Sequence, residues 1–203
     1  MVAQRKPEYM TVEEWRELER NSHDIKHEYI DGQIYAMSGG SLSHARLGSN
    51  AVRIIEDVLV AAGKSCYVYN SDVAARVSSK RYTYPDTSVT CDGRDQPAPD
   101  KLEIKSPLVI IEVLSDSTEA YDRGRKFAFY RACPTIQEYV LVTTKYQSVE
   151  VHRRTAQGWT NTQFYDQPTD EIQLVSLGIQ FPMVDLYRNS GVPETIDDPE
   201  GEV

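Results

Sequence analysis

A carboxylate inside a continuous apolar segment is the feature that most constrains how this chain folds. Residues 108–114, LVIIEVL, are apolar apart from Glu112 and show no alternation with polar residues. This pattern is typical of a strand that is buried on both faces of a sheet. Moving an ionised carboxylate out of water is costly unless a cation, a metal ion or hydrogen bonds compensate. The sequence therefore predicts a partner or a function for Glu112 in the middle of a sheet.

The residues after this strand predict a helix that carries a cation back to the sheet. Asp116 and Glu119 have the spacing of a capping box, so the strand is expected to turn directly into a helix. One stripe of that helix contains Asp122, Lys126, Phe129 and Cys133. Because the stripe also holds core residues, we expect the Lys126 side chain to point towards the sheet.

Length and composition limit the class of protein. A chain of 203 residues with 40% apolar residues fits one domain, which we predict over residues 9–188, followed by an acidic, disordered tail over 189–203. No apolar segment is long enough to span a bilayer, and the polar N-terminus lacks the apolar centre of a signal peptide. We therefore expect a cytoplasmic protein without membrane association.

Charge and cysteine content narrow the class further. The net charge of −9 argues against nonspecific attraction to nucleic acid, so a nucleic-acid function requires a local site or neutralisation by metal. Cys66, Cys91 and Cys133 are odd in number and form no Cys-x-x-Cys pair. They are expected to be buried thiols rather than disulfide partners or zinc ligands.

The N-terminal part of the chain predicts a helix, a hairpin and a second helix. Thr11 and Glu14 form a capping box for a helix that runs to about Glu19. A hairpin over residues 29–37 is indicated by its Asp31-Gly32 turn. The second helix begins at Ser41 or Ser43 and stops at Gly63.

The rest of the chain is predicted to form mostly strands. Two strands over 66–77 and 82–91 are joined by a polar turn, with Pro85 at an edge or bulge directly before Asp86. Residues 92–106 form a surface loop in which target recognition would lie. Further strands are predicted over 138–142, 149–152, 159–164 and 172–175.

Two carboxylates are expected to meet in this sheet. Asp86 and Glu112 lie on consecutive predicted strands, and a divalent cation such as Mg²⁺ or Mn²⁺ is what makes such a pair of acids stable. A bound metal activates water and neutralises charge on a phosphodiester, while Lys126 stabilises the developing negative charge. These residues predict a metal-dependent hydrolase.

Three segments carry a family resemblance: EYIDGQIYAMSGGSLSH, YTYPDTSVTCD and VIIEVLSDSTEAYDRGRKFAFYRACPTIQEYVLV. From about Tyr9 to Leu186 the chain resembles the Uma2 family, which is assigned to the restriction endonucleases of the PD-(D/E)XK superfamily. The resemblance implies an α/β (α+β) restriction-endonuclease-like core: a mixed central sheet flanked by helices, with additional antiparallel strands at the N- and C-terminal sides. It also implies that Asp86 and Glu112 are metal ligands. The superfamily lysine is replaced by Leu114 on the strand, and Lys126 takes its role from the next helix.

The matching segments contain further candidates. Glu28 could complete a metal shell, the Val113 carbonyl could add a ligand, and His44 lies on a helix stripe that could face the site. Asp72 and Ser115 also fall in or beside these segments. Arg123 and Arg125 are candidates for contacts with a nucleic-acid backbone.

Each of these residues also has a purely structural interpretation. Glu112 and Lys126 could form a purely structural ion pair, Asp86 could be a turn residue after proline, and the arginines could be a solvated helix face.

We predict a Mg²⁺- or Mn²⁺-dependent endonuclease acting on nucleic acid, with DNA as the first choice. The alternative is a catalytically silent nuclease-fold binding or scaffold protein. A homodimer, with pairing through strands between Val149 and Val175, is also expected.

Overall fold

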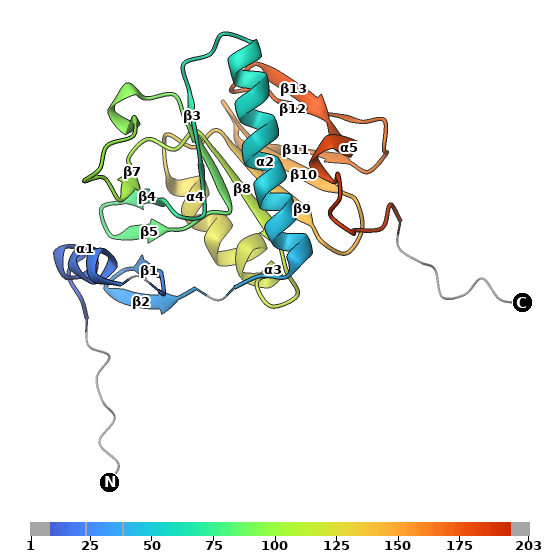
Figure 1. Cartoon of the computed structure of the whole chain (residues 1–203). Helices are drawn as coiled ribbons and strands as arrows, with labels where there is room; N and C mark the ends of the chain where they lie inside the picture. The colour runs from blue at the N-terminus through green and yellow to red at the C-terminus, as the bar shows by residue number, and fades with distance from the viewer. Residues whose placement is uncertain (1–8, 23, 38, 196–203) are drawn as a thin grey trace, which may run out of the picture.

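Two β-sheets form the framework of the protein. The structure is a computed structural model that describes residues 9–22, 24–37 and 39–195. One sheet has six strands in the order β11-β10-β9-β8-β6-β3, a second has five in the order β2-β1-β5-β4-β7, and β12 pairs with β13. The long helix α2 crosses in front of the six-stranded sheet, and α4 lies behind it (Figure 1). The predicted mixed α/β architecture is confirmed.

Strand β8 (Val109–Leu114) is the centre of this framework. All six of its residues are buried, and it pairs antiparallel with β6 (Thr87–Thr90) and parallel with β9 (Glu138–Thr143). Val109, Ile111 and Val113 pack into the core shared with α2, whereas Ile110 and Leu114 pack into the core shared with α4. Because successive side chains of a strand point to opposite faces, Glu112 lies on the α4 face with Ile110 and Leu114.

The N-terminal predictions are confirmed. Helix α1 (Val12–Asn21) begins with a complete Thr11–Glu14 capping box. Strands β1 (His27–Ile30) and β2 (Gln33–Ala36) form the hairpin, and both of its turn residues have positive φ, 52° at Asp31 and 92° at Gly32. Asparagine, aspartate and glycine favour such a turn because they tolerate this conformation. Helix α2 (Leu42–Ala61) begins at the Ser41 cap.

The two long strands predicted after α2 are wrong in extent, because each breaks into two. Strands β3 (Tyr67–Asn70) and β6 belong to the six-stranded sheet, while β4 (Ala74–Ser78) and β5 (Arg81–Thr83) belong to the five-stranded sheet. The second break covers residues 84–86, where Pro85 has no N–H for a strand ladder. The chain therefore crosses between the sheets directly at Asp86.

The segment after β8 also differs from its prediction. It consists of α3 (Glu119–Tyr121), a π-helical turn η2 (Asp122–Lys126) and α4 (Phe127–Ala132). Thr118 precedes α3 without a side-chain capping bond, so the predicted Asp116–Glu119 capping box is wrong. Single π-helical turns occur often at functional sites, since they change which side chains share a face.

The C-terminal half adds an antiparallel extension. The elements are β10 (Val149–Thr155), β11 (Gly158–Tyr165), β12 (Glu171–Leu174), β13 (Ile179–Pro182) and α5 (Met183–Leu186). The loop over 92–106 contains a short 3-10 turn η1 (Gly93–Asp95) and strand β7 (Glu103–Ile104). Strands β7 and β13 were not predicted, because both are short and lack a strong period. Within the described part of the chain, no helix has the length and apolar character to cross a membrane.

Two local predictions need correction. Cys66 and Cys91 form a disulfide, because the β3–β6 register pairs Tyr67 with Thr90 and so places the two cysteines opposite each other. Cys133 remains a buried thiol. The predicted tail begins too early, since Val192 is 7% exposed and packs into the core. The remainder of that tail, 196–203, lies outside the described residues.

Candidate active site

Glu112 and Lys126 form a buried ion pair at the centre of the α4 face. The distance from Lys126 Nζ to Glu112 Oε1 is 2.8 Å, and the two side chains are 6% and 4% exposed. The Tyr130 hydroxyl donates a 2.7 Å hydrogen bond to the same Glu112 oxygen. Glu112 thus has the partners that its position in an apolar strand predicted.

Two further carboxylates surround the same ammonium group. Lys126 Nζ lies 3.4 Å from Glu28 Oε1 and 3.7 Å from Asp122 Oδ1, and both acids are buried. Glu28 comes from β1 of the other sheet, where its Oε1 accepts the Tyr84 N–H at 3.2 Å. One positive charge is therefore shared among three acids in a region of low dielectric.

The pKa values reflect this imbalance. Burial raises the pKa of Glu112 to about 8, with Lys126 opposing the shift and the charges of Asp86 and Asp122 adding to it. Burial also raises the pKa of Asp122. For Lys126, burial lowers the pKa, but attraction by Glu112, Glu28 and Asp122 outweighs it, so the pKa lies well above its usual value. The ammonium stays charged, whereas the raised pKa values of Glu112 and Asp122 mean that the site disfavours the charged forms of these two acids.

The π-helical turn places the acid and the lysine on one face. Asp122 and Lys126 are its first and last residues, and both are buried, whereas the three residues between them are exposed. Tyr130 follows four residues after Lys126 on α4 and is also buried. The turn is held to the sheet by the Tyr139 hydroxyl, which donates to the Asp122 carbonyl at 3.1 Å. This geometry brings Lys126 and Tyr130 to Glu112 and places Asp122 beside Lys126.

Asp86 lies beside this cluster at the crossing between the sheets. Its Oδ2 accepts the Val113 N–H at 2.8 Å and lies 3.3 Å from His44 Nε2 in the first turn of α2. The hydrogen bond to Asp86 raises the pKa of His44 against the effect of burial, and the Asp86 charge and the Val113 backbone raise it further. The Asp86 carboxylate and the Val113 backbone thus both favour the protonated form of the His44 imidazole.

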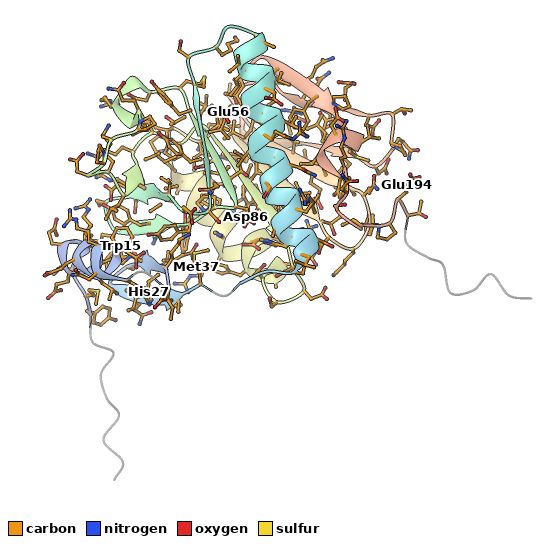
Figure 2. The ribbon with its side chains drawn as sticks, viewed as in Figure 1. Trp15, His27, Met37, Glu56, Asp86 and Glu194 are labelled. Carbon is orange, nitrogen blue, oxygen red and sulfur yellow. A yellow bond between two sulfur atoms is a disulfide. The ribbon has the colours of Figure 1, made fainter. Side chains whose placement is uncertain are left out.

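A cleft of about 590 Å³ gives access to Asp86. The residues of α2 that line it are His44, Ala45, Gly48, Ser49 and Val52, and Asn70 and Ser71 line it as well. Figure 2 shows Asp86 beside the N-terminal half of α2. Small residues on the helix leave the cleft open, so Asp86 can be reached from outside while Glu112 and Lys126 lie deeper.

The remaining sequence candidates make other contacts. Asp72 binds Lys26 and accepts a 3.0 Å hydrogen bond from Asn70. Arg123 pairs with Glu119 at 2.8 Å and Glu150 at 2.6 Å.

Arg125 and Ser115 are also engaged elsewhere. The Arg125 guanidinium lies 5.5 Å from the ring centre of Phe129. The Ser115 hydroxyl is 2.9 Å from that of Thr118. Among the described residues, no hydrogen bond or ion pair joins Asp72, Arg123, Arg125 or Ser115 to Glu112 or Asp86.

Sequence reasoning missed two tyrosines at the site. The Tyr130 hydroxyl binds Glu112, and the Tyr121 hydroxyl donates to Glu28 Oε2 at 3.3 Å. Tyr130 could have been found from its position four residues after Lys126 on the same stripe. Tyr121 gave no such signal, because its partner lies 93 residues away.

The donor set fits a hard divalent cation. No group of three or more His, Cys, Asp or Glu side chains among the described residues is already arranged around a metal position. However, Asp86 directly precedes β6, whose first residue Thr87 pairs with Ile111, so Asp86 lies next to Glu112 of β8. The Val113 N–H also donates to Asp86. Carboxylate and carbonyl oxygens are the ligands that Mg²⁺ and Mn²⁺ prefer.

This fold, with acids at the β6–β8 junction and a lysine from the following helix, is that of a restriction-endonuclease-like protein. It is similar to a crystal structure from Anabaena variabilis described as "a putative nuclease belonging to DUF820", with a TM-score of 0.69 and 20% identity. The similarity covers 88% of this chain and 97% of that chain. At this identity it concerns the fold.

The chain belongs to the Uma2 family, whose model, described as "Putative restriction endonuclease", matches residues 12–184. The predicted family is therefore confirmed. Two proteins of Synechocystis sp. are similar in sequence. The uncharacterized protein slr1290 is 38% identical, over 86% of this chain and 88% of its own length. The uncharacterized protein sll1609 is 30% identical, over 71% of this chain and 81% of its own length.

Proposed function

We propose that this nuclease-family protein is a Mg²⁺- or Mn²⁺-dependent endonuclease that hydrolyses phosphodiester bonds in DNA. The observation that carries the proposal is the surplus of carboxylates around Lys126, next to Asp86 at the end of an open cleft. A purely structural ion pair needs one acid for each cation. A surplus of buried acids is explained by a site that receives a further positive charge.

In this mechanism Asp86, Glu112 and the Val113 carbonyl would hold the cation. When bound, it would neutralise charge on the phosphate and lower the pKa of water. Lys126 would stabilise the negative charge that develops on the phosphate oxygens. Tyr130 orients Glu112 through its 2.7 Å hydrogen bond, and His44 orients Asp86 from α2.

The experiment is cleavage of supercoiled plasmid, single-stranded DNA and RNA with Mg²⁺ or Mn²⁺. We expect the wild-type protein to cleave DNA, and Glu112→Gln and Asp86→Asn to lose activity by about three orders of magnitude, equivalent to about 4 kcal/mol of barrier. Glu150→Gln is the matched control, since Glu150 pairs with Arg123 and not with Lys126. Full metal-dependent cleavage by both site variants would refute the proposal.

A second candidate function is a nuclease-fold protein that binds nucleic acid or a partner without cleavage. It is favoured by the short Lys126–Glu112 distance of 2.8 Å and by the 4% exposure of Glu112, because a cation would have to displace Lys126 partly. If wild type and Glu112→Gln bind equally and neither cleaves, this alternative holds. The homodimer and the cytoplasmic location also stay predictions.

A further inference from the structure

A second cleft, with a volume of about 380 Å³, lies between α1 and the segment that contains η1 and β7. In Figure 1 these elements lie on the left of the molecule, on the far side of β4 and β5 from α2. The basic residues that line it are Arg16, Arg20, Arg94, Lys101 and Lys105, and the acidic ones are Asp95, Asp100 and Glu103. Basic residues thus predominate here in a chain whose net charge is −9.

Two of the three acids in this cleft are already engaged by the protein. Asp95 is 3% exposed and accepts hydrogen bonds from the Thr90 hydroxyl at 3.0 Å and from the backbone N–H groups of Lys105 at 2.8 Å and Ser106 at 2.9 Å. Glu103 accepts from Arg16 Nε at 3.2 Å and Nη2 at 2.8 Å. These carboxylates hold the cleft together and do not neutralise its other cations.

Three cations in the cleft are not matched by a carboxylate. Lys101 Nζ donates to the backbone carbonyls of Arg94 at 2.7 Å and Gln96 at 2.9 Å, which are dipoles and not charges. Among the described residues, Arg20 and Lys105 have no carboxylate within ion-pair distance. The arrangement has the chemistry of an anion site, since it holds three unmatched cations in a concave surface and uses two of its three acids internally.

We propose that this cleft binds phosphate groups of a nucleic-acid backbone outside the active site. The inference rests on the proposed function, because it assigns the cleft to the same substrate. An acidic protein repels a polyanion on average, so binding requires a local region of opposite sign. Arginine and lysine in a cleft supply this region without reading base sequence.

The test measures DNA binding by the Glu112→Gln protein without added metal, so that cleavage plays no part. A labelled DNA duplex is titrated over a series of salt concentrations. The cleft variant is Arg20→Gln with Lys105→Gln. The control variant is Arg53→Gln with Lys64→Gln, which removes the same charge from exposed positions at α2 and just after it.

We expect the cleft variant to bind about tenfold more weakly at low salt, and its slope of log affinity against log salt to fall by about two, one for each phosphate contact. The control variant should keep the parent slope. An equal loss of DNA affinity in both variants would show that the mean charge of the protein, and not the cleft, sets the affinity. This result would overturn the inference.

Parent affinity in the cleft variant, together with plasmid cleavage by the wild-type protein, would overturn the inference and leave the proposed function intact. Absence of both binding and cleavage would remove the proposed function and the inference with it. These outcomes separate the two failures.

Discussion

Glu112 and Glu138 lie on the neighbouring parallel strands β8 and β9, and each has a cation within 3 Å, but their surroundings differ. Glu138 is 1% exposed and accepts the Arg153 Nε–H at 2.9 Å, the Val175 N–H at 3.0 Å and the Ser176 N–H at 2.9 Å. Arg153 also donates to Gln163, Tyr165 and the Gln173 carbonyl. One carboxylate thus pairs with one guanidinium, and both groups make further hydrogen bonds.

At Glu112 the acids outnumber the cations. One ammonium, on Lys126, lies near Glu112, Glu28 and Asp122, and the neighbouring Asp86 opens into a cleft. A buried ion pair alone is therefore not a sign of function in this protein. A surplus of acids over cations and access from outside are what distinguish the candidate active site from a structural ion pair.

The strongest test of this comparison is Arg153→Met. It leaves Glu138 buried without its cation, so we expect a loss of about 3–5 kcal/mol in the free energy of unfolding. Urea denaturation followed by circular dichroism measures it. A loss below about 1 kcal/mol would mean that the backbone N–H groups alone stabilise Glu138 and that the pair is not the structural element we describe.

Tyr130→Phe tests the structural part of the Glu112 site. The variant removes the hydroxyl that donates to Glu112 at 2.7 Å and contacts Thr83 at 3.1 Å, both buried. We expect a loss of about 1–3 kcal/mol in the free energy of unfolding. Tyr35→Phe is the control, because its exposed hydroxyl donates to Gln33 and to no other described residue. Equal stability of the two variants would contradict the assigned role of Tyr130.

The Arg123–Glu150 pair near the surface provides a pH test. Burial raises the pKa of Glu150, but hydrogen bonds from His152 and Arg123 outweigh it and lower the pKa from 4.5 to about 2. A lowered pKa means stabilisation that is present above pH 4.5 and lost as the pH falls towards 2. Glu150→Gln should thus cost about 1 kcal/mol at neutral pH and progressively less in acid. Thermal denaturation at several pH values measures this, and a pH-independent difference would disprove the assignment.

Glu112→Gln should have the smallest effect on stability. It replaces an acid whose charged form the cluster disfavours with a neutral amide of similar shape, so the free energy of unfolding is expected to change by less than about 1 kcal/mol, in contrast to Arg153→Met. The second readout is calorimetric titration with Mn²⁺, which should bind the wild-type protein and not the variant. Strong destabilisation with unchanged Mn²⁺ binding would place Glu112 in the same structural class as Glu138.

Short-range signals account for the elements that were predicted well. The Thr11–Glu14 capping box, the Asp31-Gly32 turn and the buried β8 strand each depend on residues a few positions apart. The same holds for the need of Glu112 for a partner and for the orientation of Lys126 towards the sheet. These properties follow from local conformational preference and from the cost of burying a charge.

Long-range pairing accounts for the rest. The break of two long strands into four, the Cys66–Cys91 disulfide and the approach of Glu28 to Lys126 depend on which strands lie side by side. The Glu28 carboxylate accepts from Tyr84 and Tyr121, which are 56 and 93 residues away in the chain. The sequence by itself thus determined that a buried acid and a lysine would meet. Only the tertiary structure decided how many acids would share that lysine, because this number depends on packing between two sheets and not on the spacing of residues within one element.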